Sequence, residues 1–116
     1  MEKRKRLFGD DNPGTLTTLN GLAALFRNKG DYDCALPLYE ECLEKRRKIL
    51  GDDHPNTLST LNGLAFTLFL KGECARALPL LEECLVQAKA ILGNSPDWTI
   101  LYRTRRDNCA SKLADK

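Results

Sequence analysis

Residues 9–23 of the chain read GDDNPGTLTTLNGLA, and residues 51–65 read GDDHPNTLSTLNGLA. The second stretch begins 42 residues after the first. The same register continues through further matching segments, namely Lys29-Gly30 with Lys71-Gly72, residues 35–38 with 77–80, and residues 40–43 with 82–85. Self-similarity at a fixed period is typical of chains built from repeated supersecondary units. The repeat therefore decides the fold class before any single residue does.

Each repeat carries two helical patterns. In the first repeat, apolar side chains recur at a spacing that places them on one helix face, namely Leu16, Leu19, Leu22, Ala23 and Phe26. We expect this helix to begin at residues 12–13, because proline suits the first helical turn, and to end at Gly30, because glycine tolerates a left-handed backbone. A second helix is predicted over residues 32–50, and Gly51 ends it.

The second repeat copies this pattern and predicts two more helices. The apolar face of each helix pair is too wide to be covered within the pair, so neighbouring pairs must stack. The sequence therefore predicts an all-α stack of helical hairpins in a single domain over residues 1–116. Its parts are the end of a preceding helix (1–8), repeat 1 (9–50), repeat 2 (51–92) and a partial third repeat or capping helix (93–116).

Composition restricts the class of protein. Hydrophobic residues make up 42% and charged residues 29% of the 116 residues, which is typical of a folded globular chain. The net charge of +2 is too small to argue for nucleic acid by itself. No apolar run has the length of a membrane span, and the basic segment 2–6 precedes no apolar stretch of signal-peptide length. We therefore expect a cytoplasmic protein without a membrane partner.

The residues offer no catalytic, metal or cofactor site. The five cysteines are odd in number and form no Cys-x-x-Cys pair, so we expect free thiols in a reducing compartment. Cys42 and Cys84 fall at core positions, where cysteine behaves as a small hydrophobe. His54 is the only histidine, which leaves no Cys/His zinc set or Ser-His-Asp set. The segment 10–12 lacks the oxygen spacing of a calcium loop. We predict no enzyme and no cofactor.

The apolar and small residues of the first unit follow a recognisable order, namely Leu19, Leu22, Ala23, Phe26, Gly30, Tyr32, Ala35, Tyr39 and Cys42. This order resembles the tetratricopeptide repeat (TPR). The 42-residue period and the phrase LGDDHPNTLSTLNGLA resemble, more narrowly, the kinesin-light-chain and nephrocystin type of that repeat. The resemblance implies a right-handed superhelix with a concave groove that accepts a peptide or helix of a partner protein. The first helix of each pair would line this groove.

Carried over by position, the resemblance implies a peptide-binding groove lined by Thr17, Asn20, Ala24, Arg27, Ser59, Asn62, Phe66 and Phe69. Asn20 and Asn62 match a position whose asparagine hydrogen-bonds the peptide backbone. Their alternative role is that of repeated consensus residues in contact with water. Phe66 and Phe69, together with Leu70, stand off the core stripe, and either pack beneath the C-terminal helix or contact a partner.

The sequence departs from the pattern near its C-terminus. Cys74 replaces the aromatic Tyr32 of the first unit. Aromatic and basic residues interrupt the third copy, namely Trp98, Tyr102, Arg103, Arg105 and Arg106. We interpret residues 97–114 as a more polar capping helix, which terminal repeats need. The basic stretches 2–6 and 44–48 are interleaved with glutamates, so we interpret both as solvated faces.

Three functions remain open from the sequence. The first is a protein-interaction module that holds a peptide or helix in the groove. The second is a self-assembling element, a homo-oligomer or helix-swapped scaffold, because about three repeats are normally needed for stable stacking. The third and most distant is weak nucleic-acid binding through the basic faces, with 103–106 the strongest candidate segment.

Overall fold

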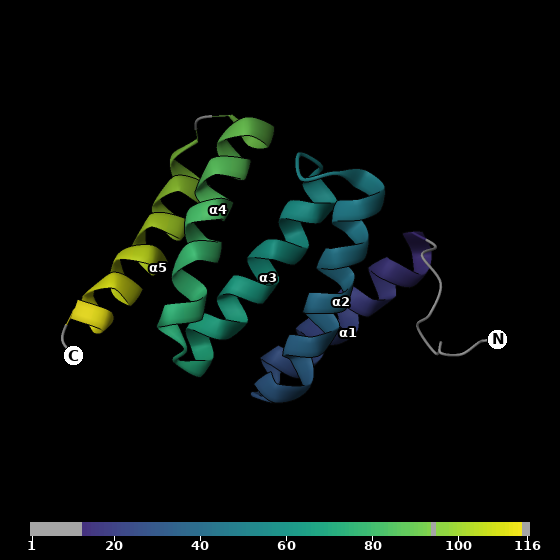
Figure 1. The fold of residues 1–116 in the computed structure, drawn as a ribbon, viewed down its shortest axis with the longest axis horizontal. Helices are drawn as coiled ribbons and strands as arrows, with labels where there is room; N and C mark the ends of the chain where they lie inside the picture. Colours follow the sequence, from purple (N-terminus) through teal and green to yellow (C-terminus); the bar gives the residue numbers. More distant parts are fainter. Residues whose placement is uncertain (1–12, 94, 115–116) are drawn as a thin grey trace.

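The computed structural model describes residues 13–93 and 95–114, which form five α-helices. Their bounds are α1 Pro13–Asn28, α2 Tyr32–Leu50, α3 Pro55–Lys71, α4 Cys74–Leu92 and α5 Pro96–Ala114. Figure 1 shows them side by side, from α1 and α2 on the right to α5 on the left. The predicted helix end at residues 1–8 and the segment 10–12 lie outside the described residues.

The helix ends follow the signals in the sequence. Pro55 begins α3, and Nδ1 of His54 accepts a hydrogen bond from the backbone N–H of Asn56 at 3.0 Å. Gly30 and Gly72 follow α1 and α3 with φ of +84° and +90°, a backbone conformation that costs glycine little. The N–H of Gly30 donates to the carbonyl of Arg27 at 2.9 Å, which closes the last turn. The predicted helix starts and stops are confirmed.

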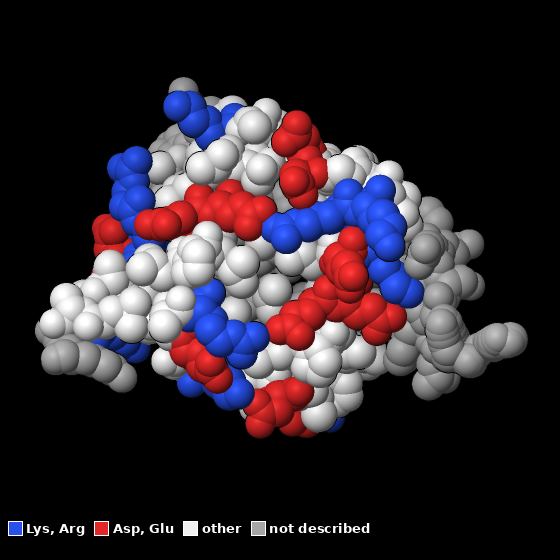
Figure 2. All heavy atoms as spheres, in the orientation of Figure 1, with Lys and Arg blue, Asp and Glu red and all other residues white. Residues whose placement is uncertain are grey.

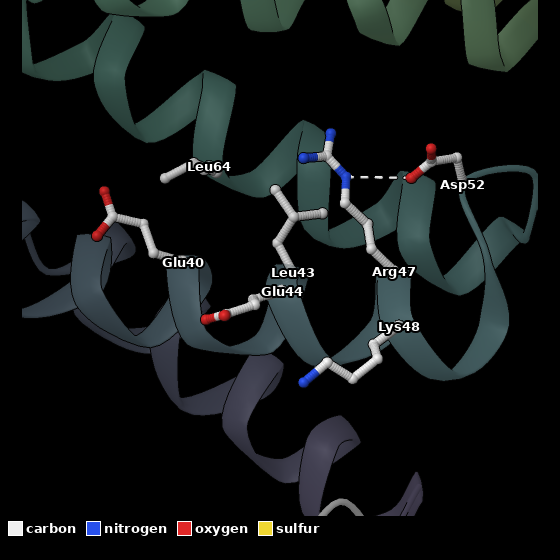
Figure 3. A pocket seen from close by; sticks show the side chains of 7 residues that line it. All are labelled: Glu40, Leu43, Glu44, Arg47, Lys48, Asp52 and Leu64. Atoms are coloured by element: carbon white, nitrogen blue, oxygen red, sulfur yellow. Dashed lines mark ion pairs between the residues drawn. The ribbon is translucent and has the colours of Figure 1, made fainter.

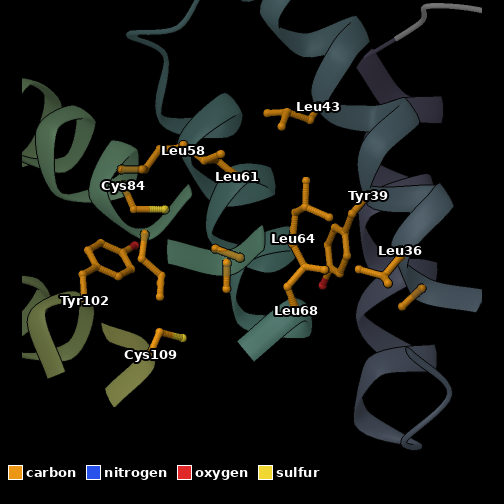
Figure 4. Packing of buried hydrophobic residues seen from close by; sticks show 14 of the residues in the cluster. Leu36, Tyr39, Leu43, Leu58, Leu61, Leu64, Leu68, Cys84, Tyr102 and Cys109 are labelled. Atoms are coloured by element: carbon orange, nitrogen blue, oxygen red, sulfur yellow. The ribbon is translucent and has the colours of Figure 1, made fainter. Parts of the chain in front are cut away.

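Successive helices pack on one another along the chain, and α1 also touches α3. Two buried clusters form the core. The larger one extends from α1 to α5 and includes Tyr39, Leu61, Leu68, Leu81 and Tyr102, most of which appear in Figure 4. The smaller one joins Leu16, Leu19 and Cys42. Each hairpin thus covers the apolar face of the next, and the predicted all-α stack of helical hairpins is confirmed.

The backbone of α3 passes unusually close to α2 at Gly63. A Cβ atom at this position would lie 2.4 Å from Cε1 of Tyr39, whose side chain is only 1% exposed. At the equivalent Gly21 of α1, no described atom lies within 4 Å of such a Cβ. The glycine is therefore required for packing in the second repeat and not in the first.

All five cysteines lie in the described part of the chain and are unpaired, four of them buried and Cys34 exposed. Cys42 and Cys84 are both fully buried, as predicted. Among the described residues, no helix has the length and apolar character that crossing a membrane requires.

Candidate functional site

The predicted groove residues all lie on α1 and α3. Thr17 and Ser59 are exposed, while the other six are partly buried. We call the surface that these residues form, together with the side chains that α5 adds to it, the first-helix face. The geometry of this surface decides what it can bind.

An aromatic pair forms the centre of the first-helix face. The rings of Phe66 and Phe69 stack with centroids 6.3 Å apart. Two guanidinium groups flank Phe66, that of Arg27 at 5.3 Å from the ring centroid and that of Arg105 at 3.8 Å. The ammonium of Lys112 lies 6.0 Å from the Phe69 centroid. These cation–π contacts join α1, α3 and α5 into one surface that is both aromatic and basic.

Arg27 is held in place by a second contact. Its Nη1 donates to the hydroxyl of Tyr39 at 3.0 Å. Burial raises the pKa of Tyr39, so this hydroxyl stays protonated and neutral beside the guanidinium. Burial also lowers the pKa of Arg105, although guanidinium groups remain charged at neutral pH. The two cations therefore have defined positions beside the ring of Phe66.

Both asparagines of the predicted groove are engaged through their side-chain oxygens. Oδ1 of Asn20 accepts from Oγ1 of Thr60 at 3.1 Å. Oδ1 of Asn62 accepts from Nη1 of Arg105 at 3.3 Å. Neither amide nitrogen donates a hydrogen bond to another described residue. These contacts fix the orientation of the two amide groups, whose N–H₂ ends each carry two hydrogen-bond donors.

The guanidinium of Arg46 is buried beneath this surface. Arg46 is 5% exposed, so the interpretation of 44–48 as a solvated face is wrong at this residue. Its Nη1 donates to Oγ1 of Thr60 at 2.9 Å and to the carbonyl of Asn56 at 3.0 Å. Its Nη2 donates to Oγ1 of Thr17 at 3.3 Å. Arg46 thus ties α2 to α1 and α3 behind Asn20.

Sequence reasoning missed Arg46, Arg105 and Lys112 as contributors to this region. A signal existed for each. Arg46 continues the helical stripe of buried Ala35, Tyr39 and Cys42, and Arg105 and Lys112 share a stripe with the buried Tyr102 and Cys109. Basic residues on a buried stripe are candidates for contacts inside the chain.

The sequence left open whether Phe66, Phe69 and Leu70 pack beneath the C-terminal helix or contact a partner, and the three residues differ in the structure. Phe66 and Phe69 are partly buried beneath cations from α5, whereas Leu70 is 41% exposed. The basic segment 103–106 divides in the same way, since Arg105 faces α3 while Arg103 is exposed. The patch is therefore partly covered by the chain at Phe66 and Phe69 and open at Leu70.

Charge elsewhere is largely balanced. Figure 2 shows acidic and basic side chains next to one another over the middle of one face. A pocket of about 490 Å³ between α2 and α3 repeats this pattern, with Glu40, Glu44, Arg47 and Lys48 around Leu43 and Leu64 (Figure 3). Its Arg47 pairs with Asp52 at 3.2 Å and also with Glu83 of α4. Within residues 13–93 and 95–114, no three His, Cys, Asp or Glu side chains gather as a metal site would require.

Comparison with known proteins agrees with this architecture. The chain matches a family model described as tetratricopeptide repeat over residues 1–44 and again over residues 15–90, which together exceed half of its 116 residues. A search of the curated proteins returned no significant match. The matched region contains the four helices α1 to α4 almost completely. Repeat period, hairpin stacking and family match agree, and the chain belongs to the tetratricopeptide-repeat family.

Proposed function

We propose that the protein is a binding module that holds a peptide or a helix of a partner protein on the first-helix face. Tetratricopeptide repeats generally mediate protein–protein interaction, and the family typically forms non-enzymatic scaffolds. The observation that carries the proposal is the contact of both Arg27 and Arg105 with the ring of Phe66, which also stacks on Phe69. Aromatic and arginine side chains are the residue types that most often anchor protein interfaces.

The polar groups around this centre support the same function. Asn20 and Asn62 lie on the same face of successive first helices, each with its amide oxygen fixed by a neighbour. A peptide that runs along the face would accept hydrogen bonds from their N–H₂ groups and pack its side chains on Phe66. Arg27 and Arg105 would favour partners with acidic or carbonyl groups near this contact.

The test is a peptide-display selection against the folded chain, followed by affinity measurements on the selected sequences. We expect Asn62→Ala to weaken binding about fivefold, since one hydrogen bond contributes about 1 kcal/mol. Glu82→Ala, an exposed site on α4, serves as the control and should bind like the parent. Arg27→Glu should weaken binding further, while Lys48→Glu on α2 should not. If the affinity of the selected peptides is the same for the parent, Asn62→Ala and Arg27→Glu, the first-helix face is not the binding site.

We also propose a cytoplasmic location, supported by five unpaired cysteines, four of them buried.

Self-assembly is the second candidate function, favoured by the exposed Ile49, Leu92, Ile100 and Leu101. Light scattering over a wide concentration range, in reductant, separates the two functions. A monomer that binds selected peptides supports the binding module, and a dimer that loses peptide binding supports the scaffold.

A further inference from the structure

A second hollow, separate from the first-helix face, lies between α4 and α5. Its volume is about 310 Å³. Lys89 of α4 and Arg103 and Arg106 of α5 give it a basic lining, and Leu85 and Trp98 contribute apolar surface. We call this hollow the α4/α5 pocket.

The α4/α5 pocket is the repeat copy of the charged pocket in Figure 3. Leu43 and Arg47 of that pocket correspond, 42 positions later, to Leu85 and Lys89. Glu44 and Leu64 likewise correspond to Val86 and Arg106, so that the second pocket loses a carboxylate and gains a cation. The same junction of a second helix with the following first helix therefore has a mixed charge in one repeat and a positive charge in the next.

The first copy shows how a following helix reaches the charged groups of such a pocket. The next helix, α4, extends Glu83 to Arg47, and Arg76 of α4 pairs with Glu40 at 3.0 Å. The cation at the base of the pocket thus receives a carboxylate from the helix that follows it. Removing that carboxylate would leave a partly buried charge without compensation.

No described helix supplies a carboxylate to the second copy. Within the described ranges, Lys89 and Arg103 form no ion pair, and Arg106 pairs only with its neighbour Asp107 at 3.1 Å. Nε1 of Trp98 is buried without a hydrogen-bond acceptor, which is costly for a strong donor. Beside these groups Val86, which also lines the pocket, is 65% exposed. The pocket offers donors, positive charge and an apolar rim in one place.

We propose that the α4/α5 pocket is the docking site for an acidic amphipathic helix of a partner protein. The helix takes the place that α4 occupies over the first pocket. It directs a carboxylate to Lys89 and Arg103, in the manner of Glu83 at Arg47, and covers Val86 with its apolar side. A second copy of this chain is a poorer occupant, because residues 2–6 of its N-terminal segment read EKRKR and would meet cations.

The test uses α4 itself as the probe. A synthetic peptide of residues 74–92, with Cys74→Ala, Cys84→Ala, Arg76→Gln and Lys89→Gln, carries Glu83 in its natural register and contains no tryptophan. It is acidic, because Glu82 and Glu83 are its only remaining charged side chains. Trp98 is the only tryptophan of the chain, so its fluorescence reports directly on the pocket. We expect a saturable change in Trp98 emission on titration. The double variant Lys89→Glu/Arg103→Glu should weaken binding at least tenfold.

A charge exchange makes the test specific. A peptide with Glu83→Lys should bind the parent chain at least tenfold more weakly, and the Lys89→Glu/Arg103→Glu variant should recover at least a threefold gain for this peptide. The peptide change leaves the chain untouched, so a folding defect cannot produce this result. Lys29→Glu, in the turn after α1, and Lys48→Glu, on α2, change exposed lysines away from the pocket; both are matched controls and should leave affinity unchanged.

Four outcomes would overturn the proposal. The first is an unchanged Trp98 emission up to about millimolar peptide, the range of very weak binding. The second is equal affinity for the two peptides. The third is loss of peptide binding in Asn62→Ala, which would place the peptide on the first-helix face. The fourth is a change in Trp98 emission with protein concentration alone, accompanied by dimers in light scattering, which would make a second copy the occupant.

Discussion

Two junctions of this chain have the same backbone plan and different interiors. Where α2 meets α3, the buried guanidinium of Arg46 donates to Oγ1 of Thr60 at 2.9 Å, and Sγ of Cys42 lies 3.6 Å from the same oxygen. The space between the helices is therefore filled by a long polar side chain from α2 and a short one from α3. Hydrogen bonds to backbone and hydroxyl oxygens satisfy the cation, and no carboxylate among the described residues pairs with it.

Where α4 meets α5, the sizes are reversed. The position 42 residues after Arg46 is Ala88, and the position 42 residues after Thr60 is Tyr102. Both are buried, next to the equally buried Cys84. A small residue on the second helix now faces a large aromatic one on the following first helix. The comparison teaches that the repeat conserves the total volume at the junction and not its chemistry.

The largest loss of stability should come from removing the Arg46 side chain from the junction of α2 and α3. Arg46→Ala removes a buried side chain, and with it the charged donor to Thr60 and to the carbonyl of Asn56. We expect the free energy of unfolding to fall by about 3 kcal/mol, through the cavity and the lost charged hydrogen bonds together. Urea unfolding followed by circular dichroism measures this loss. A change below about 0.5 kcal/mol, the range of ordinary surface substitutions, would contradict the burial of Arg46.

The second junction suggests how to recover that loss. Adding Thr60→Tyr to Arg46→Ala transplants the arrangement of Ala88 and Tyr102 into the first junction. We expect the double variant to regain at least about 1 kcal/mol relative to Arg46→Ala, because neighbouring sites that share a cavity are strongly coupled. Thr60→Tyr alone should be destabilising, since Arg46 already fills the space. A double variant no more stable than Arg46→Ala would show that the junctions are not interchangeable.

A smaller contrast is expected between the equivalent glycines of α1 and α3. Gly63→Ala would place Cβ 2.4 Å from the Tyr39 ring, and we expect a loss of about 2 kcal/mol from overpacking. Gly21→Ala meets no described atom within 4 Å and should stabilise α1 by up to about 1 kcal/mol through helix propensity. Thermal unfolding of the matched pair measures both. Shifts of the same sign would contradict the close approach of α3 to Tyr39.

The sequence was most informative where the repeat is regular. The 42-residue period, the apolar stripes and the glycines predicted the stack and the starts and ends of α1 to α3, because these features depend on local spacing. It also placed the groove candidates correctly on α1 and α3. Whether they bind a partner remains a prediction.

Less could be predicted where the third copy breaks the pattern. The contact of Arg105 with Phe66 and Asn62 depends on how α5 packs against α4 and α3, which no local spacing encodes. The prediction that Arg46 is solvated was wrong for a related reason. A run of basic residues suggests a solvated face. The helical spacing shows, however, that one member of such a run can continue the buried stripe of the helix.

The smallest expected effect is a pH dependence of stability that comes from the buried thiol of Cys84 at the second junction. Burial raises the pKa of the Cys84 thiol to about 12, whereas an unfolded cysteine titrates near its ordinary value of about 9. Below pH 9 both states keep the proton, and the stabilising contribution is fully present. As pH rises from 9 towards 12, only the unfolded state loses the proton, so the free energy of unfolding falls. Between pH 8 and pH 10 this thiol should account for a loss of about 1 kcal/mol.

Cys84→Ala should therefore flatten the pH dependence of stability by about 1 kcal/mol over that interval, because alanine has no proton to lose. Urea unfolding in reductant at pH 8, 9 and 10 measures the slope for parent and variant. Leu80→Ala, a partly buried neighbour that does not titrate, is the control and should lower stability equally at each pH. The buried Tyr102, whose pKa burial also raises to about 12, should leave a residual slope in the Cys84→Ala variant. An unchanged slope in Cys84→Ala would mean that its thiol is open to water, and that the second junction is not sealed as its apolar packing requires.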